Sequence, residues 1–180
     1  MIKSIIALSG VFLSSLLLTQ SVLAESSVLM SFTGTLIERQ PCEVLSTDEN
    51  IAVEFADVSD RYLYLNARTP GKAFEVHLIN CDVSFGDAVK VTFRGSESIQ
   101  LPGLLRLEGS SQASGIAIGM ETSSGNALPI NQQANAQTIV SGNNIITLLA
   151  YVQAEPTAIT NRTIVQGIFM AIATFELAYE

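Results

Sequence analysis

The chain has 180 residues, of which 14% are charged, and a net charge of −8 with nine lysines and arginines. This length suits one domain with a full hydrophobic core. An acidic chain whose few basic residues are not clustered is a poor match for nucleic-acid phosphates, which argues against a nucleic-acid-binding function.

Residues 1–24 match a secretory signal peptide. Lys3 precedes an apolar run over residues 5–18, and Val22-Leu23-Ala24 has small or aliphatic residues where a signal peptidase reads them. The run is too short to span a bilayer comfortably and no stop-transfer pattern follows, which disfavours the alternative of a membrane anchor. We therefore expect export, cleavage after Ala24 and no membrane insertion of the mature chain.

Residues 25–37 alternate between apolar and more polar positions, which is the period of a β-strand. A glycine notch interrupts the apolar face, which consists of Val28, Met30, Phe32, Gly34 and Leu36. From the pattern alone, this stretch is a first strand that could pair with the last strand of the same sheet or with a strand elsewhere.

The chain's two cysteines, Cys42 and Cys81, lie 39 positions apart. An exported chain meets an oxidising compartment, so a disulfide is the first interpretation and two buried thiols are the alternative. A metal site is disfavoured, because two of the usual four ligands would be missing. We predict no metal and no cofactor.

The residues that could support catalysis are few. The acidic candidates, Asp48-Glu49 and Asp57 with Asp60, lie in a turn-rich connection over residues 47–65, where acids are ordinarily solvated or cap helices. The one histidine, His77, is predicted to face solvent beside Glu75 on a strand over residues 74–78. One histidine without a free thiol leaves little basis for a nucleophilic site, so we expect no enzyme.

Further along, turn signals separate short alternating or β-branched stretches, and no segment keeps a helical period over 12 residues. The pattern predicts an all-β sandwich of antiparallel strands. The expected strands cover residues 74–78, 89–93, 116–120 and 145–152, with a short strand near 51–55 and loops at 110–114 and 131–138.

The chain ends in a long alternating stretch, residues 167–179, which predicts one continuous strand. Its residues on one face are mostly apolar: Gly167, Phe169, Ala171, Ala173, Phe175, Leu177 and Tyr179, followed by the terminal Glu180. A strand with such a face needs a neighbour on each side and a core beneath it.

These residues resemble the pilins of the chaperone–usher pathway, especially type 1 and P-type fimbrial subunits. The family pattern places a glycine 14 residues from the end and a penultimate tyrosine, as Gly167 and Tyr179 stand here. The family's A-F-x-[IV]-x-L-x-x-C strand is matched by Ala73, Phe74, Val76, Leu78 and Cys81. One departure is Phe55-Ala56, where the family often has Phe-Gly.

The resemblance implies an incomplete immunoglobulin-like sandwich that lacks its last strand. Residues 38–180 would form the pilin domain, and residues 25–37 would be a donor strand that enters the groove of a neighbouring subunit, as in β-strand addition. A periplasmic chaperone would cover the groove beside residues 167–179 and hold the carboxylate of Glu180. An outer-membrane usher would then export the subunit to the fimbria on the surface of a Gram-negative bacterium.

Within this family, a structural minor or adaptor subunit is the favoured interpretation, with a major shaft subunit close behind. A base-terminating subunit would be expected to lack an accessible groove. A carbohydrate-binding adhesin is the alternative from another class, although two-domain adhesins need about twice this length.

Overall fold

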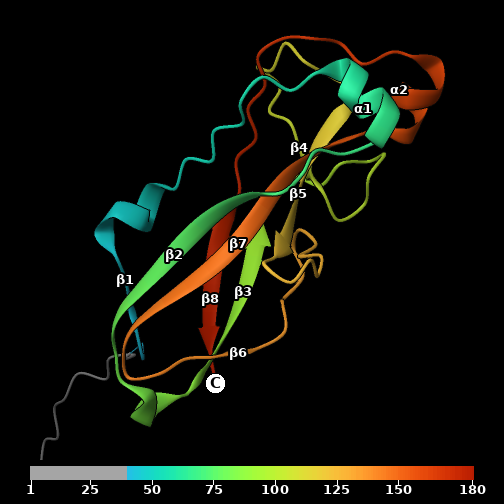
Figure 1. Cartoon of the computed structure of the whole chain (residues 1–180). Coiled ribbons are helices and arrows are strands. Elements are labelled where there is room, and N and C mark those ends of the chain that lie inside the picture. Colours follow the sequence, from blue (N-terminus) through green and yellow to red (C-terminus); the bar gives the residue numbers. More distant parts are fainter. Residues whose placement is uncertain (1–39) are drawn as a thin grey trace, which may run out of the picture. The chain divides into compact units, whose positions relative to one another are not determined.

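The computed structural model describes residues 40–180 (Figure 1). The signal peptide and the donor strand predicted for residues 1–24 and 25–37 lie outside the described residues.

Two antiparallel sheets form the domain, as the alternating pattern predicts. One sheet has the strand order β1-β2-β7-β5-β4 and the other has the order β6-β3-β8. The strands are β1 (Glu43–Val44), β2 (Lys72–Cys81), β3 (Ala88–Arg94), β4 (Leu105–Arg106), β5 (Ile116–Thr122), β6 (Gln137–Thr138), β7 (Gly142–Ala154) and β8 (Thr174–Tyr179). β6 lies in the stretch predicted as a loop over residues 131–138.

The core lies between the two sheets. The long strands β2 and β7 pair from Lys72 with Ala150 to Leu78 with Asn144, and they alternate buried and less buried residues. β3 supplies the facing layer. The largest strand side chains that are under 2% exposed belong to Val76, Leu78, Val89, Leu148 and Val152. Burial of a side chain of this size stabilises a fold by about 1.5–3 kcal/mol.

Four short helical turns connect the strands, and the sequence pattern had predicted no helix. They are η1 (Ser46–Asn50), α1 (Asp60–Asn66), η2 (Val83–Phe85) and α2 (Pro156–Asn161). The longest has seven residues, so none is long enough to show a helical period over 12 residues. The local signals are caps: Ser59 accepts from the N–H of Tyr62 at the start of α1, and Pro156 occupies the first turn of α2.

The strand predicted near residues 51–55 is not formed. This stretch is extended, and its odd-numbered residues Ile51, Val53 and Phe55 are half-buried against the core. The side-chain alternation of a strand is therefore present, but no strand of the described domain pairs with it.

Candidate functional site

A groove of about 1480 Å³ opens between two extended segments of the domain. One wall, here called the first wall, is residues 51–58, which lead from η1 to α1 in Figure 1. The other is the last segment, residues 167–179, which lies before and within β8. The floor is apolar and comes from both sheets: Phe74, Phe93, Leu105, Ile118, Met120 and Ala150.

The last segment has one strand neighbour in the described domain, β3, which pairs with β8 from Val89 opposite Tyr179 to Arg94 opposite Thr174. Ala88 and Glu180 exchange both backbone hydrogen bonds, at 3.0 and 3.3 Å. Hydrogen-bonded pairs alternate with non-bonded pairs in an antiparallel ladder. The N–H and C=O groups of Phe175, Leu177 and Tyr179 therefore point away from β3, toward the free edge.

The side chains of the last segment alternate as their sequence does. The apolar face is half-buried and packs against the core: Phe169, Ala171, Ala173, Phe175, Leu177 and Tyr179. The intervening residues Ile168, Met170 and Ile172 are 76%, 53% and 60% exposed. The same residues of β8 thus offer to the groove both apolar side chains and backbone groups that no described strand pairs with.

The prediction of one continuous strand over residues 167–179 is wrong, because regular pairing begins only at Thr174. Before it, the chain bonds to a loop instead of a strand: the carbonyl of Met170 accepts from Glu108 N, and that of Ile168 accepts from Gln112 N, both at 2.8 Å. Gly167 fits closely against this loop. Its φ is +149°, and a Cβ there would lie 2.6 Å from Gln112 Cβ, so only glycine suits the position.

The end of the last segment is held by contacts beside β3. Glu180 pairs through its side chain with Lys90 Nζ. Burial raises the pKa of the Tyr179 phenol, and its hydroxyl is buried with no hydrogen-bond partner among the described residues.

The first wall packs its apolar side chains against the core and contacts both the last segment and the sheet. The rings of Phe55 and Phe169 lie 6.1 Å apart between centroids, so aromatic side chains meet across the groove. Lys72 Nζ donates to the carbonyl of Glu54. The wall is therefore fixed mainly by side chains.

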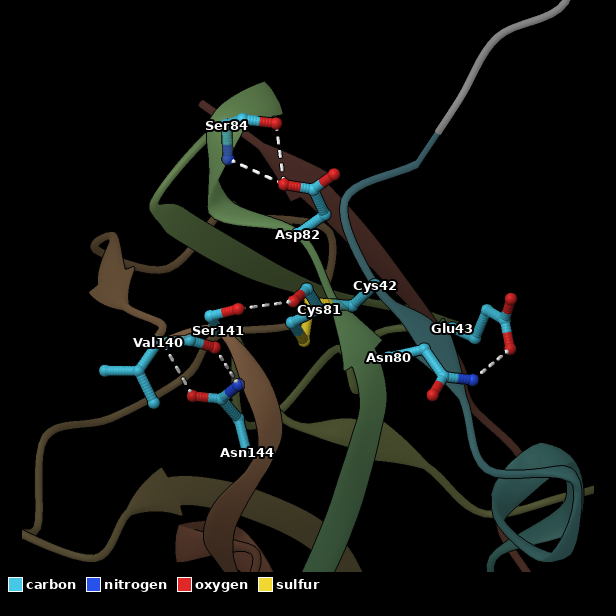
Figure 2. The surroundings of a disulfide bond; sticks show 9 residues. All are labelled: Cys42, Glu43, Asn80, Cys81, Asp82, Ser84, Val140, Ser141 and Asn144. Atoms are coloured by element: carbon cyan, nitrogen blue, oxygen red, sulfur yellow. Dashed lines mark hydrogen bonds between the residues drawn. A yellow bond between two sulfur atoms is a disulfide. The ribbon is translucent and has the colours of Figure 1, made fainter.

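A disulfide joins Cys42 to Cys81 and fastens the start of the domain to the end of β2 (Figure 2). Both residues are buried, at 1% and 4% exposure. Polar contacts surround the bond, since Ser141 Oγ donates to the carbonyl of Cys81 at 3.3 Å and Asn80 Nδ2 donates to Glu43 at 3.0 Å. The disulfide interpretation is confirmed, and the alternative of two free thiols is wrong.

Comparison with known proteins decides the family. A family model described as "Fimbrial protein" matches residues 30–180. The chain belongs to this family. The fimbrial adapter PapK of Escherichia coli is 34% identical over 156 residues, covering 83% of this chain and 86% of PapK. The Fimbria A protein of Serratia marcescens is 31% identical over 151 residues, covering 84% of this chain and 83% of that protein.

The crystal structure of the P pilus rod subunit PapA has the same fold, with a TM-score of 0.68 at 21% identity over 78% of this chain and all of that chain. The protein is thus a structural fimbrial subunit with an immunoglobulin-like fold, and its place is a pilus at the cell surface. No helix of the described part is long and apolar enough to cross a membrane.

Two of the acidic candidates of this fimbrial subunit, Asp60 and Asp48, have defined partners in the structure. Asp60 starts α1 and accepts from Gln166 Nε2 at 2.8 Å. Asp48, predicted to be solvated or capping, is instead buried, and it contacts His77. His77 was predicted to face solvent, but its side chain is 34% exposed and lies between Asp48 and Glu75. Among residues 40–180, no three His, Cys, Asp or Glu side chains are grouped to hold a metal ion.

Sequence reasoning missed a second buried carboxylate, Glu121, on the face of the sheet formed by β5 and β7. Arg68 binds it with two bonds, of 2.8 and 3.0 Å, and the guanidinium lies 3.8 Å from the centroid of the Tyr151 ring. The hydrogen bonds to Glu121 raise the pKa of Arg68. Arg68 and Glu121 are 53 positions apart, so no local sequence pattern predicts that they form a pair. Bidentate, partly buried pairs of this kind are among the stronger ion pairs.

Gly119 lies directly beneath the Tyr151 ring, and an added Cβ would lie 2.1 Å from its Cζ atom. Gly119→Ala is therefore expected to destabilise the subunit by about 1–3 kcal/mol through overpacking. Thermal unfolding of the purified subunit would measure this. Gly109→Ala is the matched control, because no atom lies within 4 Å of a Cβ there. Equal melting temperatures for the two variants would contradict the prediction.

Proposed function

We propose that this fimbrial subunit polymerises by donor-strand exchange, in which its groove takes up the N-terminal extension of a neighbouring subunit. The observation that carries the proposal is the free edge of β8 above an apolar floor. One inserted strand would pair with the outward N–H and C=O groups of Phe175, Leu177 and Tyr179 and would cover Phe93 and Met120. This is β-strand addition between subunits.

The donor in this proposal is residues 25–37 of each subunit, ahead of the pilin domain of residues 38–180. Four apolar side chains, Val28, Met30, Phe32 and Leu36, would enter pockets of the acceptor's groove, with Gly34 where a side chain would collide. At about 1.5–3 kcal/mol for each buried side chain, they contribute on the order of 6–12 kcal/mol before backbone bonds and ordering costs.

A subunit with a free apolar edge needs a partner before assembly, because such edges aggregate. We assign this role to a periplasmic chaperone that lends a strand to the groove and binds the carboxylate of Glu180 with basic side chains. An outer-membrane usher would then deliver the subunit to the fibre. This route fits the signal peptide predicted for residues 1–24 and implies a Gram-negative cell.

The proposed place of the subunit in the fibre is a minor or adaptor position. The accessible groove favours a subunit that accepts a strand and argues against a subunit that terminates the fibre. The identity of 34% to the fimbrial adapter PapK supports this position.

The test is to mix the chaperone-bound subunits of the fimbria, this one included, with a peptide spanning residues 26–37. Release of chaperone from at least one subunit is expected, and native gel electrophoresis would follow it. A peptide with Phe32→Asp should release none, whereas one with Thr33→Asp, on the opposite face, should act like the wild-type peptide. If the wild-type peptide displaces chaperone from no subunit, the exchange mechanism is wrong for this chain.

A further inference from the structure

The main-chain pairing between β1 and β2 stops abruptly at Leu45. β1 pairs Glu43 with Ile79 and Val44 with Leu78, so the same register places Leu45 opposite His77. The N–H of Leu45 does donate to the carbonyl of His77, at 3.0 Å. In a continuing antiparallel ladder, the N–H of His77 would return a bond to the carbonyl of Leu45.

That bond between His77 N–H and the Leu45 carbonyl is absent, and Asp48 binds both of these groups instead. Its own N–H donates to the carbonyl of Leu45 at 2.8 Å, and its Oδ2 atom accepts from the N–H of His77 at 2.6 Å. The same oxygen lies 2.8 Å from Nδ1 of the His77 ring. The carboxylate thus replaces a main-chain acceptor at the edge of β2, and the ladder ends there.

The environment of the carboxylate fits this role. Asp48 is 8% exposed, and its other oxygen contacts Thr47 Oγ1 at 3.2 Å. The pKa of Asp48 is lowered, chiefly because the backbone N–H of His77 donates to it, against the opposing effect of burial. Hydrogen bonds to a charged acceptor are worth more than those between neutral groups.

The chain direction changes at this contact. Residues 46–50 coil into η1, and residues 51–58 then run along the groove as the first wall, with no partner among the strands of residues 40–180. Had the ladder continued past Leu45, these residues would have stayed on the edge of β2, away from the last segment. The place where the ladder ends therefore sets where the first wall begins.

We propose that Asp48 is a positioning residue for strand uptake: by ending the β1–β2 ladder at His77, it places residues 51–58 as the second edge for the incoming strand. This inference rests on the proposed donor-strand function and adds to it the residue that forms the second wall of the acceptor. The occupant is the extension of a neighbouring subunit, which would lie between residues 51–58 and the last segment.

The test uses the chaperone-bound subunit and two measurements. The first is amide exchange of His77 and of residues 51–58 before any peptide is added. The second is the rate of chaperone release by the donor peptide that acts on the wild-type subunit. In Asp48→Ala, exchange at His77 should accelerate about tenfold or more, as expected for loss of a hydrogen bond to a charged group, and peptide uptake should slow by a similar factor.

Matched variants separate positioning from a general loss of stability. Asp87→Ala removes an exposed carboxylate that does not line the groove and should leave both measurements at wild-type values. Asp48→Asn keeps an oxygen that can accept from His77 and should restore most of the protection and the uptake. If Asp48→Ala does not survive in the periplasm, Asp48→Ser serves, because its oxygen is set back by about one bond length.

Unchanged exchange at His77 and residues 51–58 in Asp48→Ala or Asp48→Ser would overturn the proposal, as would equal effects of the Asp48 and Asp87 changes. If no peptide displaces chaperone even from wild type, the proposed function fails, while the exchange measurement still tests the placement of the first wall by Asp48.

Discussion

A fimbrial subunit carrying Phe175→Asp is expected to be missing from fibres. Phe175 is half-buried against the core, its side chain lines the groove, and its backbone faces the free edge of β8. A carboxylate at this point would be buried by the incoming strand without a cationic partner, which costs several kcal/mol. That cost corresponds to a loss of strand affinity of more than about a hundredfold. Immunogold electron microscopy of purified fibres would measure incorporation.

The adjacent position supplies the control, because Thr174 is exposed on the opposite face of β8. Thr174→Asp introduces the same charge one residue away and should leave incorporation intact. Phe32→Asp tests the donor side, since it lies outside the pilin domain: such a subunit should accept a strand but fail to donate one. Normal fibre labelling with either Phe175→Asp or Phe32→Asp would contradict donor-strand exchange.

In wild-type fibres, label confined to one end supports the adaptor position, and label along the shaft contradicts it.

The sequence predicts the sandwich where alternation and burial coincide. In β2 the odd-even pattern places Val76 and Leu78 in the core, and in β8 it places Phe175 and Leu177 on the groove side. A period of two is a local property that follows from strand geometry, so it can be identified without knowing which strands pair.

Pairing cannot be predicted in this way. Residues 51–55 and 167–173 alternate as strands do, yet neither belongs to a strand of the described domain, because a strand is defined by hydrogen bonds to a neighbour. In the proposed function, that neighbour comes from another subunit. An incomplete sandwich would therefore leave residues 51–55 and 167–173 without regular strand pairing, although both alternate as strands do.

Side-chain contacts between residues that are far apart in the sequence could not be predicted from the sequence either. The local sequence predicts Asp48 to be an acidic residue of a turn. Its proposed positioning role depends instead on a hydrogen bond from the N–H of His77, 29 positions away. The bond between Arg68 and Glu121 likewise depends on how β7 lies between β5 and the chain that precedes β2. Such contacts follow from the fold and carry no signal in the local sequence.

Loss of the disulfide is the second large effect expected. The double variant Cys42→Ser/Cys81→Ser should lower the free energy of unfolding by about 4 kcal/mol, from the chain entropy of a loop spanning 39 positions. This is a large share of the roughly 5–15 kcal/mol that stabilises a typical domain. The melting temperature of the peptide-bound subunit should fall by roughly 10 °C, and the periplasmic yield should fall with it.

The loss should act first on the groove. β1 pairs only two residues, Glu43 and Val44, with β2, so the covalent bond at Cys42 supplies much of what holds the start of the first wall to the sheet. In the double variant, amide exchange of Leu45, whose N–H donates to His77, is therefore expected to accelerate more than exchange in the β2–β7 pair. Ser141→Ala is the control, because it removes only the hydrogen bond to the Cys81 carbonyl. A double variant that melts within about 2 °C of wild type would show that β1 and η1 hold the wall without the covalent bond.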